Sequence, residues 1–290
     1  MREYLKKAYY TVKYFLFRIK RTPIILDMEK TVNLIVDNNL SVSRYGEGEF
    51  RKMFDDSYKY KNRLFSAFQN ESPNLLTCVS GMIYANIYRL AKSCRHFYRW
   101  YGTYYGLKTT RLLGKKRKYG EACITRFYLD YKKKDFDHKL PSHIQNMKKI
   151  WEKRNILFVE GEHSKNGVGN DLYDNALSIR RILCPDKDSI EIVDKIKDHI
   201  LKHYKDGDLV LVSSGFAGSI ICSELGATTN IQCVDIGNLD VEYIWYLNKC
   251  TKKRFIKGKN SAEAVDGPDA IVLKEDAEKY QSEIIDRIIK

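Results

Sequence analysis

Two strand-loop-helix units in the second half of the chain constrain the fold more than any other feature of the sequence. Residues 156–159 and 209–212 are short, continuously apolar runs, which is typical of strands buried on both faces of a sheet. A glycine-containing loop follows each run, and apolar periodicity then predicts helices over 172–183 and 219–225. Residues 231–236 are predicted to form the next strand. Such units in series predict an α/β fold with a Rossmann-like, mostly parallel sheet flanked by helices.

The sequence divides into three segments. Residues 1–26 read as a basic amphipathic helix ended by Pro23, which is too charged to span a bilayer and has no signal-peptide core. Residues 27–260 are predicted to form one α/β domain, and residues 261–290 a C-terminal helical tail. A chain of 290 residues with 43% hydrophobic residues is long and apolar enough to bury a substantial core.

The net charge of +14 is regional. Residues 1–21 hold seven Lys and Arg against one acid, and residues 89–154 hold nineteen against five. The sequence contains no nucleic-acid-reading motif, so we expect no nucleic-acid partner. A polyanion, an anionic lipid surface or a phosphorylated substrate would each account for the charge. The N-terminal helix either lies on an anionic membrane surface through residues 1–21 or docks on the domain with its basic side solvated.

Cysteine usage points to a reducing compartment. The seven cysteines are scattered and form neither a CxxC pair nor a Cys/His cluster, so the sequence predicts neither a disulfide framework nor a zinc site. The predicted location is the cytoplasm, either free or at the inner face of the membrane.

The stretch SVSRYGEGEF, residues 41–50, carries the most concentrated chemistry. It reads as a half-buried strand followed by a glycine turn at Gly46. In an extended or turning segment Glu47 and Glu49 project to the same side, and such a pair suits a hard divalent cation, Mn²⁺ or Mg²⁺. Arg44 offers a planar donor fork for phosphate. The alternative is a solvated acidic turn neutralised by Arg44.

The loop after the 156–159 strand is a candidate for phosphate binding. A strand, a glycine loop and a helix N-terminus together present free backbone amides and a positive dipole end to a diphosphate. The residues predicted to contribute are Lys165, Gly167, Gly169, Asn170 and Asp171, the last two as candidate helix caps. The alternative is a connecting loop without a ligand.

Three further features complete the candidate site. Arg126 lies at the end of a predicted strand over 122–127, where it can face a cleft. Asp235 comes twenty positions after Gly215, where a nucleotide-binding fold often carries a ribose-binding acid. The aromatic run over 97–105 either stacks on sugar rings or bases or belongs to the core, and we favour the core.

Residues 41–50, 159–185 and 213–247, taken together, resemble the GT-D-fold glycosyltransferases, formerly the DUF1792 family. The resemblance covers roughly residues 30–260. It implies a bacterial sugar transferase that takes its sugar from a nucleotide donor. It also implies that an acidic DxE element serves the metal and the nucleotide, and Glu47 and Glu49 match that element.

The sequence departs from the family pattern at three positions. Glu47 stands where the family usually has Asp, Lys165 where it has Arg, and Asn238 where it commonly has His. The missing histidine removes one proton-transfer group. The predicted general bases are therefore Asp240, Glu160 and Glu162.

The predicted function is metal-assisted transfer of a sugar from a nucleotide-sugar donor, a UDP-sugar, to a glycan or lipid-linked acceptor in bacterial surface polysaccharide or glycoconjugate synthesis. Two alternatives stay open: a non-catalytic protein that binds polyanions or a membrane surface, and another Rossmann-like nucleotide-sugar enzyme.

Overall fold

The computed structural model describes residues 2–19, 22–114, 117–260, 264, 266–274 and 277–289. Within these ranges nine strands form one sheet in the order β1-β4-β3-β2-β8-β7-β5-β6-β9, and every pairing between them is parallel. The strands are β1 Ile24–Ile25, β2 Ser41–Tyr45, β3 Leu75–Val79, β4 Lys118–Glu121, β5 Asn155–Gly161, β6 Ser178–Cys184, β7 Leu209–Ser213, β8 Gln232–Asp235 and β9 Ile284–Arg287. The predicted mostly parallel sheet is therefore confirmed.

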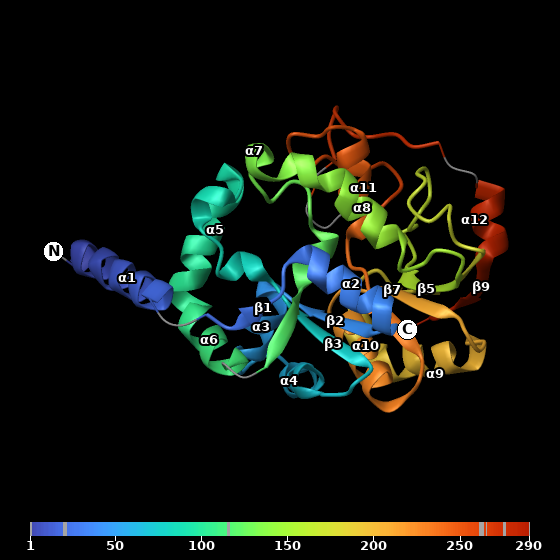
Figure 1. The fold of residues 1–290 in the computed structure, drawn as a ribbon, viewed down its shortest axis with the longest axis horizontal. Coiled ribbons are helices and arrows are strands. Elements are labelled where there is room, and N and C mark those ends of the chain that lie inside the picture. Colours follow the sequence, from blue (N-terminus) through green and yellow to red (C-terminus); the bar gives the residue numbers. More distant parts are fainter. Residues whose placement is uncertain are drawn as a thin grey trace.

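Helices cover both faces of the sheet, as Figure 1 shows. The α-helices are α1 Arg2–Ile19, α2 Met28–Asn38, α3 Glu47–Met53, α4 Lys61–Gln69, α5 Lys92–Tyr101, α6 Leu107–Leu113, α7 Lys133–Phe136, α8 Leu140–Lys148, α9 Val193–His203, α10 Phe216–Thr228, α11 Leu239–Leu247 and α12 Ala277–Glu283. A π-helical turn, η3 Gly102–Gly106, joins α5 to α6, and a 3-10 turn, η4 Ala122–Thr125, follows β4.

Two hydrophobic cores lie on opposite faces of the sheet. One contains side chains of α3, α4, α9 and α10, and the other contains side chains of α2, α8 and α11. The strands β5 and β7 contribute alternate residues to the two cores, for example Leu157 to the first and Phe158 to the second. Burial on both faces is the reason these strands read as unbroken apolar runs.

The sheet has a topological switch point, where the chain leaves two neighbouring strands toward opposite faces. The neighbouring strands β2 and β8 lead into α3 and α11 respectively, which pack on opposite faces. Their carboxyl ends therefore diverge and leave a crevice between them. In open α/β sheets ligands bind at such a crevice.

The predicted helix over 172–183 is wrong. Residues 178–184 form β6, which pairs with the full length of β5. Ile179 and Leu183 have helical spacing, but the run SIRRILC gains a complete ladder of hydrogen bonds beside β5. A short apolar run cannot be assigned to helix or strand by periodicity alone.

The predicted strand over 122–127 is displaced. The strand β4 ends at Glu121, and residues 122–125 form η4 instead. Glu121 accepts a hydrogen bond at 2.9 Å from the backbone N–H of Cys123, and this bond closes the turn. The displacement moves Arg126 from the end of a strand into the loop after η4.

The predicted C-terminal helical tail contains α12 but continues into the sheet. The strand β9 pairs in parallel with β6 at the sheet edge. Arg181 on β6, which is 2% exposed, forms ion pairs with Glu160 at 2.6 Å and with Glu283 at 2.8 Å. Residues 261–263, 265, 275–276 and 290 of the predicted tail lie outside the described residues.

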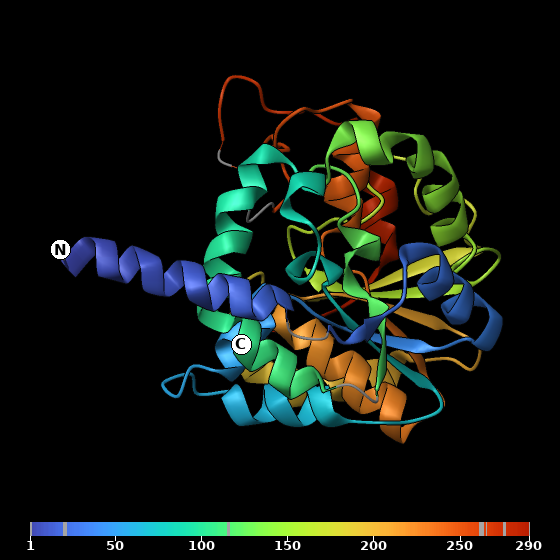
Figure 2. The ribbon, with the colours of Figure 1, turned by 60° about the vertical axis from the view of Figure 1, so that its left-hand side comes forward.

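The predicted N-terminal helix is present as α1, although residues 1, 20 and 21 lie outside the described part. The helix extends away from the body (Figure 2) and packs through Tyr14 and Phe17 on η3. An apolar stripe on it is exposed, namely Leu5, Tyr9, Val12, Leu16 and Ile19. No described helix is long and apolar enough to cross a bilayer. Contact of residues 1–21 with an anionic membrane surface stays a prediction.

Candidate active site

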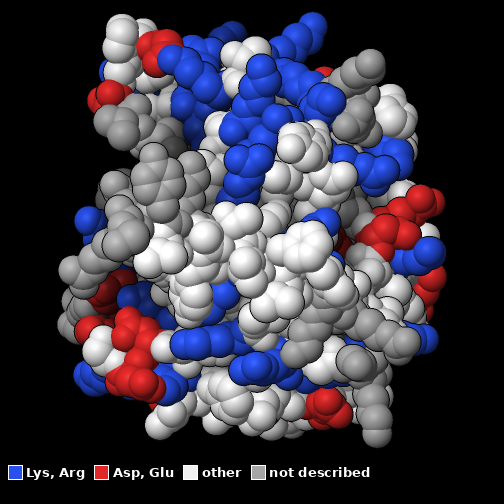
Figure 3. Space-filling view, turned by 90° about the vertical axis from the view of Figure 1, so that its left-hand side faces the viewer, with Lys and Arg blue, Asp and Glu red and all other residues white. Residues whose placement is uncertain are grey.

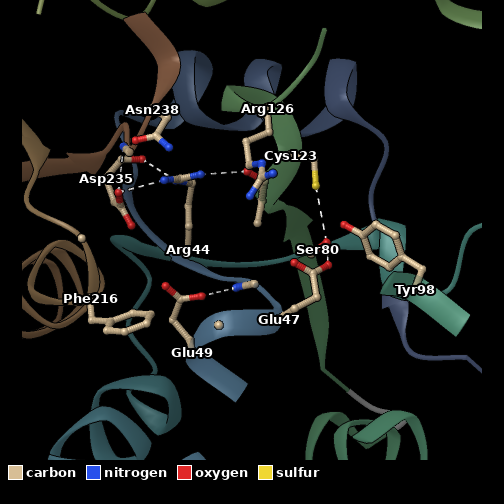
Figure 4. Close-up of a pocket in the computed structure, with 15 residues that line it drawn as sticks. Arg44, Glu47, Glu49, Ser80, Tyr98, Cys123, Arg126, Phe216, Asp235 and Asn238 are labelled. Atoms are coloured by element: carbon tan, nitrogen blue, oxygen red, sulfur yellow. Dashed lines mark hydrogen bonds and ion pairs between the residues drawn. The ribbon is translucent and has the colours of Figure 1, made fainter. Parts of the chain in front are cut away.

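A cavity of about 370 Å³ lies at the carboxyl ends of β2 and β8, at the switch point of the sheet. Its walls come from the start of α3, from η4 and the loop after it, from the start of α10 and from the turn after β8 (Figure 4). It is lined by Arg44, Gly46, Glu47, Gly48, Glu49, Ser80, Tyr98, Ala122, Cys123, Arg126, Gly215, Phe216, Asp235, Gly237 and Asn238. The central stretch of the sequence thus does lie at the candidate site.

Arg44 joins three elements beneath the cavity. Its Nε and Nη2 donate to the carbonyl and the carboxylate of Asp235 at 2.8 and 3.0 Å. Its Nη1 donates to the carbonyl of Ala122 at 3.1 Å and to the hydroxyl of Thr125. Its side chain is 13% exposed. Arg44 was predicted to grip phosphate, but most of its donors are engaged within the protein, where they connect β2 to β8 and to η4.

Asp235, predicted to bind ribose, forms part of the cavity wall and anchors the turn after β8. Its Oδ1 accepts from Arg44 and from the backbone N–H of Gly237 at 3.1 Å, and its Oδ2 accepts from the Ser219 hydroxyl at 3.3 Å. Gly237 has φ +47°, and a Cβ there would lie 2.0 Å from Arg44 Nη2. The close approach of the Arg44 guanidinium therefore requires glycine at this position.

Glu47 and Glu49 lie in the first turn of α3, and this corrects the expectation that an extended segment projects both to one side. Positions i and i+2 of a helix point about 200° apart. Glu47 is 9% exposed and accepts a hydrogen bond from the Ser80 hydroxyl at 2.7 Å. Glu49 turns back and accepts from the backbone N–H of Gly46 at 2.8 Å, capping the helix (Figure 4).

The donor set of the cavity fits a divalent cation mainly through Glu47. Magnesium in enzymes is usually bound by one or two carboxylates together with substrate phosphates and water. Glu47 uses one oxygen for Ser80, and Glu49 uses one for Gly46, so each retains an oxygen atom beside the cavity. Among the described residues one group of three side chains lies close enough together to hold a metal ion, His199, His203 and Asp286, and it lies on α9 and on the edge strand β9, not at the cavity.

Three carboxyl groups, one in the cavity lining and two buried behind it, have raised pKa values. Burial raises the pKa of Glu49, Glu121 and Glu242 to about 7 in each case. Glu121 accepts from the backbone N–H groups of Gly81 and Cys123, both at 2.9 Å, so its carboxyl group lies beneath the wall that carries Ser80 and Cys123. A carboxyl group whose pKa is higher in the folded than in the unfolded state binds extra protons on folding. Its contribution to stability is complete below about pH 4.5 and is lost as the pH rises through 7.

The Glu121→Gln variant is therefore expected to become more stable than the wild type as the pH rises. Glutamine keeps an acceptor for both backbone N–H groups and carries no charge at any pH. The difference in unfolding free energy, variant minus wild type, should increase by about 1 to 3 kcal/mol between pH 5 and pH 8. Melting temperatures measured across that range check this result. Parallel curves for the two proteins would show that Glu121 has an ordinary pKa in the fold.

The predicted phosphate loop, residues 165–171, is built differently from the expectation. The loop is followed by the strand β6 and not by a helix. Its backbone N–H groups donate to buried carboxylates. The N–H of Asn166 donates to Glu160 and the N–H of Gly167 donates to Asp240, both at 2.8 Å. Lys165 points its ammonium over the ring of Tyr280 at 5.9 Å, away from the cavity.

The remaining loop residues are also held internally. Asn170 donates its side-chain amide to Asp240 at 2.7 Å, and Gly169 packs beside Leu273. Asp171 accepts from Tyr243 at 2.6 Å and from Lys148 at 2.8 Å. The loop therefore lies at the end of β5 and not in the lining of the cavity.

The three predicted general bases lie outside the cavity as well. Asp240 is 1% exposed, forms an ion pair with Lys259 and accepts from the 165–171 loop. Glu160 is fully buried with Arg181. Glu162 is largely exposed and pairs with Arg287 at 3.1 Å. The structure thus places Asp240 and Glu160 as internal partners of one loop and Glu162 on the surface.

Several lining residues were not predicted from the sequence. Ser80 comes from a segment that lacks a recognisable motif. Tyr98 lies in the aromatic run 97–105, for which the sequence favours the core, and it belongs to a buried cluster and also lines the cavity. Phe216 is the first residue of α10, and the sequence analysis assigned no ligand to the loop before it, although Gly215 with φ +58° is a sign of a tight turn at a strand end. The turn Gly237-Asn238 was noted only for its missing histidine.

Comparisons with known proteins agree with this geometry. The family model for the glycosyltransferase GT-D fold matches residues 42–264. The chain is 29% identical over 270 residues to Glycosyltransferase GlyD of Streptococcus pneumoniae serotype 4, covering 90% of this chain and 32% of that protein. It is 27% identical over 271 residues to Probable glycosyl transferase Gly of Streptococcus gordonii, covering 90% and 38%. The chain therefore spans about a third of the length of these curated relatives.

Solved structures share the whole fold. One described as "The highly conserved domain of unknown function 1792 has a distinct glycosyltransferase fold" superposes with a TM-score of 0.82 at 28% identity, covering 97% of this chain and 100% of that one. Another, described as "A New Glycosyltransferase (DUF1792) from Streptococcus sanguinis", superposes with a TM-score of 0.81 at 24% identity, covering 92% of this chain and 100% of that one. At this identity the similarity supports the fold alone.

The chain has the architecture of an open α/β enzyme fold, in which ligands bind at the switch point of the sheet, and its polar cavity lies there. With the family model matching from β2 to beyond α11, the chain belongs to the glycosyltransferase GT-D fold family. The resemblance found in the sequence is confirmed.

Proposed function

We propose that the chain transfers a sugar from a UDP-sugar to a glycan or lipid-linked acceptor in bacterial surface polysaccharide or glycoconjugate synthesis. The observation that carries this proposal is the switch-point cavity, which brings Glu47, Arg126 and the N-terminus of α10 around one space. A basic side chain and a helix N-terminus suit a diphosphate, and Arg126 and the first turn of α10 supply them. The ring of Phe216 adds a flat apolar surface.

The transfer exchanges one carbon-oxygen bond for another. The oxygen of the acceptor hydroxyl forms the new bond to the anomeric carbon of the sugar, and the bond from that carbon to the diphosphate breaks. The hydroxyl proton passes to a base, and the nucleoside diphosphate leaves with the bonding electrons. Catalysis therefore requires positive charge near the diphosphate and a proton acceptor near the hydroxyl.

A divalent cation, Mn²⁺ or Mg²⁺, would be held by Glu47, with Glu49 beside it. When bound, such an ion neutralises charge that develops on a leaving diphosphate. The chain's own cationic contribution is Arg126, which is one-third exposed and is held at 2.6 Å by Asp130. This ion pair orients the guanidinium at the cavity wall.

The proton acceptor in this proposal is a carboxylate of the cavity. Asp240 and Glu160 are engaged in ion pairs away from the lining. They hold the end of β5 and the loop after it, and we assign them that positioning role. Two acids of α3 line the cavity, and because Glu47 is assigned to the cation, the proton acceptor in this proposal is Glu49.

A thermal-shift panel tests the proposal. The panel combines UDP, GDP and CDP with Mn²⁺, Mg²⁺ or EDTA, on the wild type and on Glu47→Gln. A ligand present at a hundred times its Kd adds about 2.7 kcal/mol to stability, which should raise the melting temperature by several degrees. We expect a shift with UDP in the presence of metal, and a smaller one in the variant.

The same panel can overturn the proposal. If no nucleotide shifts the melting temperature under any metal condition, the cavity is not a nucleotide site. In that case the polyanion-binding alternative gains support. A shift with GDP or CDP instead of UDP would retain the nucleotide site and replace the donor.

A further inference from the structure

A second cavity, of about 660 Å³, joins the first. The two share four lining residues, Glu47, Gly48, Tyr98 and Arg126. Its other walls come from α3, from the start of α5, from residues 129–130 and from the loop after α11. Residues of α10 and of the turn after β8 line only the first cavity. The second cavity is therefore a separate space that meets the first at Glu47 and Arg126.

The walls of the second cavity are positively charged. Four cationic side chains line it, Arg51, Arg126, Lys252 and Lys253, against two acids, Glu47 and Asp130. Figure 3 shows that Lys and Arg also gather at the upper end of the molecular face on which α1 and α5 lie. A neutral ligand in such a cavity would displace water from the cationic groups without offering them an anionic partner. This loss of hydration is unfavourable.

The buried Asp130 forms ion pairs with two of these cationic side chains. Its side chain is 3% exposed and lies 2.6 Å from Arg126 and 3.3 Å from Lys253. The Sγ of Cys94 also donates to it at 3.2 Å. One buried carboxylate thus orients two cations in the cavity wall, which lowers the entropy cost of binding an anion there.

Aromatic side chains also line the second cavity. Phe97, at the middle of α5, lines the second cavity and is 37% exposed, and Tyr98 beside it lines both cavities. The guanidinium of Arg51 lies 5.1 Å from the ring centre of Trp100 on the same helix. A flat aromatic ring offers a surface for the apolar face of a sugar.

From these observations we infer that the second cavity is the acceptor site and that it takes a saccharide bearing an anionic group, a phosphate or a carboxylate. The inference rests on the proposed function, since it assigns the acceptor to the cavity that adjoins the donor. The anionic group lies among Lys252, Lys253 and Arg126. The sugar ring packs against Phe97, and a hydroxyl of the ring reaches the junction at Glu47.

Binding experiments on the full chain saturated with UDP and Mg²⁺ test the inference. The probes are glucose 1-phosphate, glucuronate, methyl glucoside and inorganic phosphate, measured by ligand-observed NMR. At least one anionic sugar should bind about tenfold more tightly than methyl glucoside and than phosphate. Binding of glucose 1-phosphate alone would identify a sugar phosphate as the acceptor class, and binding of glucuronate alone would identify an acidic sugar.

Two charge reversals locate the site. Lys252→Glu changes a residue of the cavity wall, and Lys257→Glu changes an exposed lysine five residues further along that does not line it. The first variant should weaken the anionic sugar at least tenfold, whereas the second should change it less than twofold. Neither should alter the affinity for UDP, which is measured first and tests the donor site separately.

Two results would overturn the inference. One is methyl glucoside binding as tightly as the anionic sugars. The other is Lys252→Glu behaving like Lys257→Glu. Absence of UDP binding, by contrast, would remove the proposed donor site, so the two failures can be distinguished.

Discussion

Replacing Glu47 by glutamine is expected to lower the turnover number at least about 100-fold. The Glu47 carboxylate lines both cavities and is therefore the acid best placed to hold a cation beside the reacting groups. Glutamine has nearly the same volume and can still accept the hydrogen bond from Ser80, so the fold should persist. Release of UDP from a UDP-sugar in the presence of acceptor measures the effect, and the melting temperature reports the fold.

Glu49 variants provide the matched comparison. Glu49→Ala is expected to abolish turnover, but it also removes the cap on Gly46 and should destabilise α3 by about 1 kcal/mol. Glu49→Gln keeps an acceptor for that N–H and removes only the charge. Full activity in Glu47→Gln would show that the Glu47 carboxylate is not required for catalysis. Full activity in both Glu49 variants would leave Glu49 as a helix cap alone.

Replacing Arg44 by methionine is expected to lower the unfolding free energy by about 3 to 5 kcal/mol, which should reduce the melting temperature by roughly 6 °C or more. The change leaves the buried Asp235 carboxylate without its cation and removes the hydrogen bonds to η4. Chemical denaturation with a single transition measures the free energy.

Arg51→Met is the control for this prediction. Arg51 also carries its charge beside a cavity, but it is exposed and lies over an aromatic ring, so its loss should cost about 1 kcal/mol or less. An Arg44→Met protein as stable as the wild type would mean that the guanidinium is available to substrate, as the sequence had suggested.

The strands could be predicted because their signal is local. Residues 156–159 and 209–212 were assigned correctly, since a strand buried on both faces is apolar along its length. The segment 231–236 contains β8 as predicted, although the buried Gln232 and Asp235 interrupt its apolar pattern. The segment 172–183 failed for the opposite reason. Its apolar residues fit a helix and a strand equally well, and only pairing with β5 decides between them.

The wrong helix over 172–183 also led to a wrong expectation for the neighbouring 165–171 loop. With a helix after it, the 165–171 loop would present free amides to a diphosphate. With β6 after it, the loop turns inward, and its amides bind Glu160 and Asp240. Glu47 and Glu49 show the same dependence on context, because their direction changes when the turn after β2 becomes the first turn of a helix.

The sequence alone was enough for the class of fold, the family and the stretch that forms the floor of the cavity. These depend on short-range patterns: apolar runs, glycine turns and the order of motifs along the chain. The roles of single side chains depended on partners far away in sequence. Arg44 meets Asp235 across 191 positions, and Asp240 meets Gly167 across 73, through the order of strands in the sheet. Such contacts are set by tertiary packing, because a charged side chain is held by whichever partner the fold brings within hydrogen-bonding distance.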